Sequence, residues 1–351
     1  MSETGFWDIP LGTRRDLAEE TVVVAAACAA GIFEALADEP ATAPDLAERL
    51  DFELRPTGIL LAVLADSGLL RSRNGVYSLT ERARSTLADP SADDYAAGGL
   101  PLWLDNLGAF TVLPRVLESG GPVEEERSSR ESATESDGQV AAEPDEASQD
   151  AAAREGERLA RFMAAMNAAP RERIRRLVDL CLERAPNAAR ALDLGGGPGH
   201  MSREFARRGL DVVLFDLPET VRFVASEYGL EDEPAIGLEG GDFNEDPLPP
   251  GPFDIVLMSN ILHIYGPGKN RALLRKVAEV TAEGGVCAIA EFVRGASPRA
   301  ARFALIMLLK TEEGNTYSRE EYVGWLREAG FRDPRLEHLD EDRQLLTALR
   351  A

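Results

Sequence analysis

A run of glycines near the middle of the chain follows a short apolar segment, in the order Asp193-Leu194-Gly195-Gly196-Gly197-Pro198-Gly199-His200. Glycines placed directly after a strand let the backbone approach a ligand closely, and the next helix offers its N-terminal amides to an anion. The dinucleotide fingerprint G-x-G-x-x-G needs a third glycine at position 200, where this chain has a histidine. The remaining pattern, with an acid just before the glycines, disfavours a pyrophosphate and suits a ligand that carries an ammonium group.

A second acid stands at the end of the next apolar segment. Asp216 follows Val212-Val213-Leu214-Phe215, a position from which a carboxylate accepts hydrogen bonds from a ribose diol. The pair of acids therefore favours a ligand with an ammonium group and a ribose. The plain alternative is a glycine-rich turn that binds nothing.

The elements that must position these residues alternate along the second half of the chain. Apolar runs that are typical of buried strands are Arg190–Leu194, Val212–Phe215, Phe253–Met258 and Val286–Ala290, and helical stretches lie near His200–Arg208, Pro218–Tyr228 and Lys269–Thr281. This alternation predicts an α/β fold with a doubly wound parallel sheet. Such sheets bind ligands outside the carboxyl ends of their strands, which is where both acids lie.

The first part of the chain, residues 1–118, reads as mostly helical. Helical periodicity covers Arg14–Leu36 and Arg55–Leu70, a capped short helix is expected over Ala43–Leu50, and Asn74-Gly75 predicts a hairpin turn before Val76–Leu79. Two short helices followed by a hairpin form the outline of a winged helix.

An acidic insert separates this part from the sheet, and we place it at residues 119–158. From Val123 to Arg158 the sequence has twelve acids and four arginines, with no aromatic side chain and no large aliphatic one beyond Val123 and Val140. Such a composition buries too little apolar surface to offset the entropy lost on ordering, so we expect most of it to be flexible. A helix over Asp150–Arg158 that continues into the next segment is compatible with the pattern.

Four motifs occur in order along the chain: Asp193–Gly199, Phe215-Asp216-Leu217-Pro218, Gly241-Asp242-Phe243 and Asn260-Ile261-Leu262-His263. Together they resemble the class I S-adenosylmethionine (SAM)-dependent methyltransferases, specifically the small-molecule O-methyltransferases of the plant caffeate and bacterial polyketide and pigment type. The resemblance covers nearly the whole chain outside the acidic insert. It implies a Rossmann-like methyltransferase sheet over residues 159–351, an N-terminal winged-helix dimerisation domain, and a homodimer that binds S-adenosyl-L-methionine and a small-molecule acceptor.

The resemblance also assigns roles to individual residues. Gly195 and Gly197 would run along the methionine part of the cofactor, Asp216 would bind the ribose, and Asp242 with Phe243 would flank the adenine. Asp193 completes the cofactor-binding set, as the acid before the glycines. No carboxylate cluster has the spacing of a magnesium site, so we expect no metal.

His263 falls where the family has its general base, and Glu291 falls where a glutamate orients that base. A hydroxyl must lose its proton as the methyl group arrives, and a histidine with a pKa near ~6.5 is suited to take it at neutral pH. A carboxylate on the other ring nitrogen would fix the tautomer and stabilise the imidazolium. Three departures from the family pattern leave a second interpretation open, a hydrogen-bonded structural histidine: Thr316 replaces a second glutamate, Ser259 replaces a lysine, and Ile264-Tyr265 replaces Asp-Trp.

Two pairs of apolar residues are candidates for the substrate pocket. Phe162 and Met166 match an F-x-x-x-M pattern that lines the pocket in the family, and Phe303 and Met307 have the same spacing. The alternative is that both pairs belong to the ordinary core, which is the commoner fate of such stripes.

Composition excludes several classes of protein. The formal net charge of -23 over 351 residues disfavours surfaces that bind nucleic acid or anionic lipid. The longest apolar run, Val22–Phe33, is shorter than the ~20 residues of a membrane span, and no signal peptide is evident. The cysteines Cys28, Cys181 and Cys287 are too scattered for a disulfide framework, so we expect a cytoplasmic protein.

Two other functions remain open at this point. The altered neighbours of His263 are compatible with C-methylation, or with SAM-binding relatives that act as hydroxylases or decarboxylases, which fold resemblance does not separate. A winged-helix regulator with a SAM sensor domain is the more remote alternative. The candidate recognition helix Arg55–Leu70 carries one basic residue, Arg55, and also Asp66. A helix that reads DNA shows a basic face, so this composition argues against the regulator.

Overall fold

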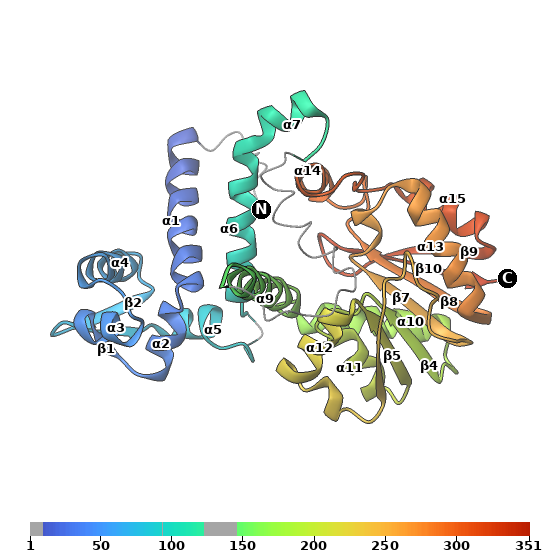
Figure 1. The fold of residues 1–351 in the computed structure, drawn as a ribbon, viewed down its shortest axis with the longest axis horizontal. Helices are drawn as coiled ribbons and strands as arrows, with labels where there is room; N and C mark the ends of the chain where they lie inside the picture. The colour runs from blue at the N-terminus through green and yellow to red at the C-terminus, as the bar shows by residue number, and fades with distance from the viewer. Residues whose placement is uncertain (1–9, 93, 123–145) are drawn as a thin grey trace. The chain divides into compact units, whose positions relative to one another are not determined.

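The computed structural model describes residues 10–92, 94–122 and 146–351, so most of the predicted acidic insert lies outside the described residues. By contacts the chain divides into two compact units (Figure 1). The first comprises Met1–Gly108 and Ala160–Pro170, and the second comprises Ala109–Leu159 and Arg171–Ala351. The units divide the chain at other points than the predicted boundaries at 118 and 158, and those boundaries stay a prediction.

The first unit combines short helices with a small antiparallel sheet of order β1-β3-β2. Its elements are α1 (Leu11–Ala29), α2 (Ile32–Asp38), β1 (Ala41–Thr42), α3 (Ala43–Arg49), α4 (Leu54–Asp66), β2 (Leu70–Arg73), β3 (Val76–Leu79), α5 (Glu81–Leu87), η2 (Ala97–Gly99) and α6 (Leu100–Ala109), of which the last residue belongs to the second unit. The predicted hairpin is present, and the turn residues Asn74 and Gly75 both have positive φ. The helical stretch predicted over Arg14–Leu36 is broken into two helices at Gly31, whose φ is 70°.

A capping box explains where helix α3 begins. The side chain of Thr42 accepts a hydrogen bond from the backbone N–H of Asp45, and the Asp45 carboxylate accepts one from the backbone of Thr42. This capping box starts α3 with Pro44 in its first turn. Phe33, Leu36, Leu46, Leu61 and Leu64 then pack into the core of this unit with no measurable exposure.

The second unit is built on a seven-stranded sheet of order β6-β5-β4-β7-β8-β10-β9. The strands are β4 (Arg190–Leu194), β5 (Asp211–Asp216), β6 (Ile236–Gly240), β7 (Phe253–Ser259), β8 (Thr281–Glu291), β9 (Phe331–His338) and β10 (Gln344–Arg350). The helices are α7 (Leu113–Ser119), the first part of α9 (Glu146–Asn167), α10 (Arg171–Arg184), α11 (His200–Arg207), α12 (Pro218–Glu227), α13 (Pro267–Val280), α14 (Ala300–Lys310) and α15 (Arg319–Glu328), with the 3-10 turns η3 (Phe110–Val112), η4 (Leu230–Asp232) and η5 (Leu262–Ile264).

The prediction of an α/β fold with a Rossmann-like sheet is confirmed, and the four strands expected from the sequence pair in parallel, but the sheet as a whole is mixed. Strands β4 to β8 pair in parallel, whereas β10 pairs antiparallel with both β8 and β9. The central strands are buried on both faces and read as continuous apolar runs. The edge strand β9 is mostly exposed on one side and carries four charged residues, so its sequence has no such run.

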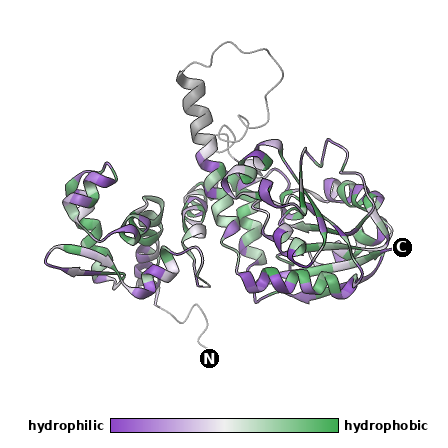
Figure 2. Cartoon of the chain, turned by 90° about the horizontal axis from the view of Figure 1, so that it is seen from below, coloured by the Kyte–Doolittle hydropathy of each residue, from purple (hydrophilic) through white to green (hydrophobic). Residues whose placement is uncertain are grey.

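A contiguous apolar core holds the sheet and its helices together (Figure 2). Leu192 and Leu194 of β4, Val256 of β7, and Leu274 and Val277 of α13 are all fully buried in it. Strand order places β4 between β5 and β7, where the direction of chain progression reverses. Ligands bind at this switch point in open α/β sheets, so the carboxyl ends of β4, β5, β7 and β8 form the edge to inspect.

Among the described residues, no single helix is long and apolar enough to cross a membrane. By length and composition alone, the helices Gly12–Ala29 and Ile32–Asp38 pass that test as a pair, which is bent by 60°.

Candidate functional site

The turn after β4 places backbone, and no side chains, at the switch point. Gly195, Gly197 and Gly199 have φ values of 68°, 49° and 73°, a region that L residues with side chains rarely adopt. The backbone N–H of Gly195 donates to the carbonyl of Phe215 at 2.7 Å, which ties the turn to the end of β5. A Cβ atom on Gly195 would lie 2.2 Å from Cδ1 of Ile261, so the turn also packs closely against the segment after β7.

Two carboxylates lie beside this turn. Asp193 is buried in β4, where the hydroxyl of Ser202 donates to its Oδ2 at 2.7 Å. Burial, together with the charge of Asp216, raises the pKa of Asp193 to about 6. Asp216 accepts the backbone N–H of Gly197 at Oδ2 and that of Leu217 at Oδ1, both at 2.8 Å, and burial raises its pKa as well. Neighbouring buried carboxylates of this kind favour a ligand that brings positive charge.

The loop after β6 lies next to the glycine turn. Asp242 accepts hydrogen bonds at Oδ1 from the backbone N–H and the side-chain amide of Asn244 at 2.8 and 3.2 Å. The ring of Phe243 is nearly buried, and a Cβ atom on Gly195 would lie 3.8 Å from it. Phe243 also meets Tyr265 edge to face, with ring centroids 5.8 Å apart. The structure thus brings Gly195 and Phe243 together, and their roles toward the cofactor stay a prediction.

These residues fit S-adenosyl-L-methionine. Each oxygen of Asp216 receives one backbone hydrogen bond and retains a lone pair for a ribose hydroxyl. A flat apolar face at Phe243 suits an adenine, and the raised pKa values of Asp193 and Asp216 suit a cofactor with an ammonium and a sulfonium group. Asp193 is engaged by Ser202, so its direct contact with the cofactor remains a prediction.

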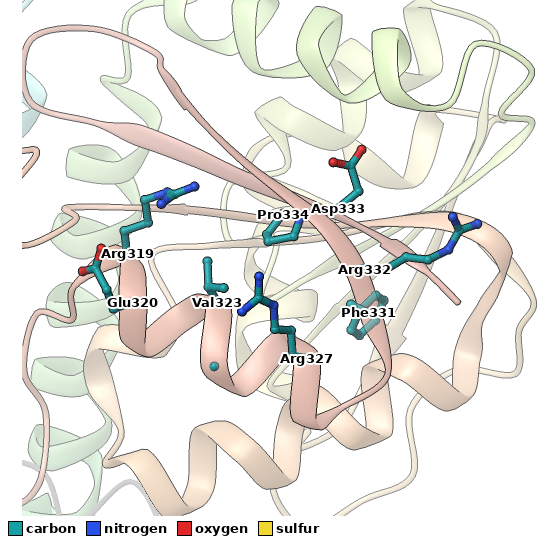
Figure 3. Close-up of a pocket in the computed structure, with 9 residues that line it drawn as sticks. Arg319, Glu320, Val323, Arg327, Phe331, Arg332, Asp333 and Pro334 are labelled. Carbon is teal, nitrogen blue, oxygen red and sulfur yellow. The ribbon is translucent and has the colours of Figure 1, made fainter.

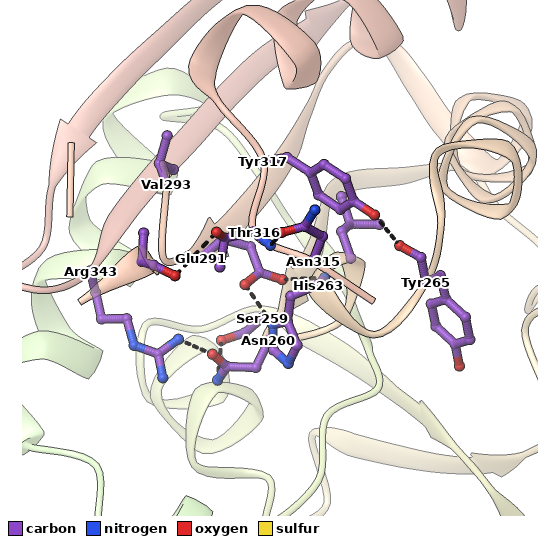
Figure 4. A network of polar contacts seen from close by, with 12 residues as sticks. Ser259, Asn260, His263, Tyr265, Glu291, Val293, Asn315, Thr316, Tyr317 and Arg343 are labelled. Carbon is purple, nitrogen blue, oxygen red and sulfur yellow. Dashed lines mark hydrogen bonds and ion pairs between the residues drawn. The ribbon is translucent and has the colours of Figure 1, made fainter. Parts of the chain in front are cut away.

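His263 and Glu291 form a buried pair at the same edge of the sheet (Figure 4). His263 lies in η5, just after β7, and Glu291 is the last residue of β8. Nδ1 of His263 lies 2.7 Å from Oε2 of Glu291, and the backbone N–H of His263 donates to Oε1 at 3.3 Å. A carboxylate at Nδ1 favours the tautomer with its proton on that nitrogen, which leaves Nε2 as the acceptor. The structure therefore brings together the two residues that the sequence assigned to proton transfer.

Hydrogen bonds from two other segments of the chain hold the backbone carbonyls of the histidine turn. The side-chain amide of Asn270 donates to the carbonyls of Leu262 and Tyr265 at 2.9 and 3.1 Å. The backbone N–H of Asn315 donates to the carbonyl of His263 at 2.9 Å. Asn260 has a φ of 63°, a conformation that asparagine tolerates better than most residues. The sequence analysis missed Asn270 and Asn315, because neither stands in a motif and both act through contacts with the distant histidine turn.

Two aromatic rings pack in succession between His263 and the end of β8. Phe303 of α14 meets the His263 imidazole edge to face with a centroid distance of 4.7 Å, and Phe292 packs on Phe303 at 4.4 Å. Met307 is nearly buried one turn further along α14. Phe303 therefore lies beside the candidate base, and the pocket role of Phe303 and Met307 stays a prediction. Phe162 and Met166 lie on the part of α9 in the other unit, so their pocket role stays a prediction.

The departures from the family pattern have structural consequences. Thr316 is fully buried, and its hydroxyl donates to the carbonyl of Ala300 at 3.2 Å. It therefore serves the first turn of α14, and Glu291 is the carboxylate that contacts His263 in the described part of the chain. Ser259 lies at the end of β7 within hydrogen-bond range of the amide of Asn260, at 3.5 Å.

The other histidines occupy different surroundings. Nδ1 of His200 is buried and has no hydrogen-bond partner among the described residues. Burial, reinforced by the charge of Arg173, lowers the pKa of His200 to about 4, so this ring is neutral at pH 7. His338 is exposed at the end of β9, with Nδ1 3.4 Å from Nε2 of Gln344. Within the described ranges, no group of three or more histidine, cysteine, aspartate or glutamate residues has the arrangement of a metal site.

A shallow surface hollow lies elsewhere, between α15 and the start of β9 (Figure 3). Arg319, Arg327 and Arg332 line it together with Val323 and Pro334. The β9 residues of the hollow lie at the opposite end of the strands from Glu291, because β9 runs parallel to β8, and the hollow includes none of the candidate-site residues. It is therefore separate from the candidate site.

Comparisons with known proteins agree with this geometry. Residues 148–332 match a family model described as an O-methyltransferase domain, and residues 20–89 match one described as an O-methyltransferase dimerisation domain. The chain is 30% identical over 331 residues to 3-hydroxy-5-methyl-1-naphthoate 3-O-methyltransferase of Streptomyces sahachiroi, covering 90% of this chain and 87% of that protein. It is 33% identical over 151 residues to tetracenomycin polyketide synthesis 8-O-methyl transferase TcmO of Streptomyces glaucescens, covering 41% and 44% of the two chains.

A similar fold is found in human N-acetylserotonin methyltransferase, whose structure was solved in complex with SAM. The TM-score is 0.76 at 24% identity, with all of both chains covered. The family models and the full-length relative, together with the glycine turn, the paired acids and the dimerisation segment, lead to one conclusion: this chain belongs to the SAM-dependent O-methyltransferase family with an N-terminal dimerisation domain.

Proposed function

We propose that this protein methylates a hydroxyl group of a small aromatic or polyketide-like molecule, with His263 as the general base. The observation that carries the proposal is the buried 2.7 Å contact between His263 and Glu291 beside the glycine turn. An imidazole so oriented accepts a proton at Nε2, and it lies at the edge of the sheet where the cofactor-binding residues gather.

Different residues of this chain bind the cofactor, accept the proton and orient the acceptor. SAM, when bound, supplies an electrophilic methyl group. Nε2 of His263 accepts the proton that the hydroxyl loses. Glu291 accepts the hydrogen bond from Nδ1–H and stabilises the imidazolium that results. Asp216 and the glycine turn hold the nucleoside and the methionine part. Much of the acceleration comes from keeping the acceptor oxygen in line with the methyl group, and Phe303 supports this by packing beside the base.

The aromatic character of the acceptor is supported by two independent observations. Phe303 packs beside His263 and Phe292 packs on Phe303, an aromatic surface that suits a flat unsaturated molecule. The Streptomyces sahachiroi relative is named for a hydroxynaphthoate, and the Streptomyces glaucescens relative for a polyketide.

Two measurements test the proposal. Calorimetry should show that SAM and S-adenosylhomocysteine (SAH) bind and that NAD does not, because the turn lacks the third glycine of a dinucleotide site. Incubation with SAM and a panel of naphthols, hydroxynaphthoates and hydroxyanthraquinones should give products that mass spectrometry identifies as O-methyl ethers. Binding of NAD without SAM, or methylation at carbon only, would contradict the proposal.

We further propose that the protein works as a homodimer through the winged-helix segment. Leu54, Ile59 and Val63 on α4 are 52%, 53% and 41% exposed, an apolar face inside the matched dimerisation region. Light scattering should therefore give twice the chain mass of 38.0 kDa. Ile59→Asp with Val63→Asp should shift the protein to a monomer at micromolar concentration. Leu117→Asp, at a residue 70% exposed in α7, is the matched control and should stay dimeric.

A further inference from the structure

The guanidinium of a half-buried arginine lies at the same edge of the sheet as His263. Arg343 directly precedes β10, and its guanidinium carbon lies 3.5 Å from the ring centroid of Phe292, the first residue after β8. Its Nη1 donates to the side-chain carbonyl of Asn260, the first residue after β7 (Figure 4). Arg343 thus reaches from β10 across the end of β8 to the end of β7. Burial lowers the pKa of Arg343 to about 10, so the group stays charged at neutral pH.

The neighbouring arginines form ion pairs with carboxylates, whereas Arg343 forms none with any residue that the structure describes. Arg173 pairs with Asp340 at 2.9 Å, and Arg299 pairs with Asp342 at 3.1 Å. Both aspartates of the turn before β10 are therefore engaged. Over residues 10–92, 94–122 and 146–351, no carboxylate forms an ion pair with Arg343, and Asn260 offers it only a neutral amide oxygen. The carboxylates of Glu291 and Asp340 favour the charged guanidinium from beyond ion-pair distance, so Arg343 remains available to pair directly with a carboxylate of a ligand.

Arg343 lies close to the side of His263 where we place the acceptor. Phe292, which it covers, packs on Phe303 with centroids 4.4 Å apart, and Phe303 meets His263 at 4.7 Å. Arg343 and His263 therefore flank the same pair of aromatic rings. Arg173 and Arg299, which also act on Arg343, are each paired with an aspartate. The carboxylates of Glu291, Asp193 and Asp216 add negative charge at this edge, in a chain of net charge -23. An anionic acceptor would be repelled here without a fixed positive group.

We propose that Arg343, anchored by Asn260, binds a carboxylate of the methyl acceptor, so that the acceptor is a hydroxylated aromatic acid. The hydroxyl of such a molecule faces His263 while its carboxylate receives the N–H groups of the guanidinium, a pairing that arginine makes in bidentate fashion. This inference rests on the proposed function and narrows its substrate class. The naphthoate in the name of the Streptomyces sahachiroi relative is an aromatic acid of this kind.

The test uses a ligand pair that differs in charge alone. The protein saturated with SAH is titrated by calorimetry with 1-naphthoate and with 1-naphthamide. The wild type should bind the naphthoate at least tenfold more tightly. Arg343→Met should reduce naphthoate affinity at least tenfold and leave naphthamide affinity unchanged, which also shows that the pocket is folded. Arg343→Lys should fall between the two, since it keeps the charge and loses the planar fork.

Arg332→Met is the matched control, because it removes an arginine of β9 that lines the distant hollow (Figure 3). It should bind both ligands as the wild type does. The inference is overturned if the wild type does not prefer the naphthoate, or if Arg343→Met keeps that preference. It is also overturned if Arg343→Met weakens SAH tenfold while naphthoate binding is unchanged, since the carboxylate bound would then be that of the cofactor. A wild type that prefers naphthoate but methylates no hydroxyl in the panel would instead contradict the proposed function alone.

Discussion

The two halves of the candidate site are built in different ways. The cofactor half consists of short segments at the ends of β4, β5 and β6, and its hydrogen bonds join backbone amides to Asp216 and Asp242 within their own loops or the adjacent one. The acceptor half is assembled from side chains far apart in sequence. His263 and Glu291 are separated by 28 positions, and Arg343 and Asn260 by 83.

This difference in construction indicates that one half binds the cofactor and the other determines selectivity for the acceptor. The half that we assign to the cofactor consists of backbone groups and acids that lie close together in the sequence, so a local motif is sufficient to define it. A half made of side chains from β7, β8, α14 and the turn before β10 changes with each substitution, and so can adapt to one acceptor. Variants in the cofactor half should therefore change the affinity for SAM, and variants in the acceptor half should change the rate of methyl transfer.

The largest effect is expected for His263→Ala. Removing the proton acceptor should lower the rate of methyl transfer by about 10²- to 10⁴-fold, the usual contribution of a positioned general base. SAH affinity should stay within about threefold, since His263 belongs to the acceptor half. Single-turnover kinetics and calorimetry measure the two quantities. A loss below tenfold, with a rate that follows the acceptor's own pKa across a substrate series, would show that His263 only positions the acceptor.

Glu291→Gln tests whether the neighbouring carboxylate orients the base. The amide retains a hydrogen bond to Nδ1 but no longer stabilises the imidazolium, so we expect a smaller loss of rate than for His263→Ala. Ser259→Ala, beside the same turn but not bonded to the imidazole, is the control and should change the rate little. Equal losses for Glu291→Gln and Ser259→Ala would argue against the orienting role.

Asp216→Ala should show the converse pattern. Loss of a buried acceptor of ribose hydrogen bonds should weaken SAM binding by about 1–3 kcal/mol, which corresponds to roughly 5- to 150-fold. The rate at saturating cofactor should change much less than it does in His263→Ala. Asp246→Ala, in the next loop, removes a carboxylate bonded to the backbone of Asp242 and serves as a local control. If Asp216→Ala left SAM affinity unaltered, the ribose assignment would be wrong.

The same distinction explains how far the sequence predicts the molecule. The glycine turn, Asp216 and strand β4 follow from local pattern, because glycine, an acid at a strand end and a continuous apolar run have direct conformational meaning. The capping box at Thr42 and the hairpin at Asn74-Gly75 are predictable for the same reason. The partnership of His263 with Glu291 came from the family resemblance, since nothing local in either segment indicates the other.

What could not be predicted depends on tertiary contacts. The antiparallel β10 pairs with β8 across more than fifty residues of sequence, and β9 lacks a strand-like apolar pattern because it is an exposed edge. Arg343 stands among ordinary charged residues in the sequence Glu341-Asp342-Arg343, and only the packing on Phe292 distinguishes it. Thr316 aligned with a carboxylate position, but its burial against Ala300 shows a structural use.

The smallest expected effect concerns the pH dependence of cofactor binding, which belongs to the cofactor half alone. Burial and the charge of Asp216 raise the pKa of Asp193 to about 6, so in the free protein this carboxyl is protonated below that pH. A ligand with an ammonium group favours the ionised form, so binding at lower pH must release a proton. SAH affinity should therefore be constant above about pH 7 and fall by about tenfold at pH 5.

Calorimetry at pH 5 to 7.5, in buffers of different ionisation enthalpy, measures both the affinity and the protons released. Asp193→Asn should flatten the profile without abolishing it, because the pKa of Asp216 is raised as well and that group titrates in the same sense. His263→Ala should leave the profile unchanged, since the acceptor half takes no part in SAH binding. A wild-type affinity that is level down to pH 5 would show that Asp193 does not interact with the cofactor's charge and only holds Ser202 of α11 against β4.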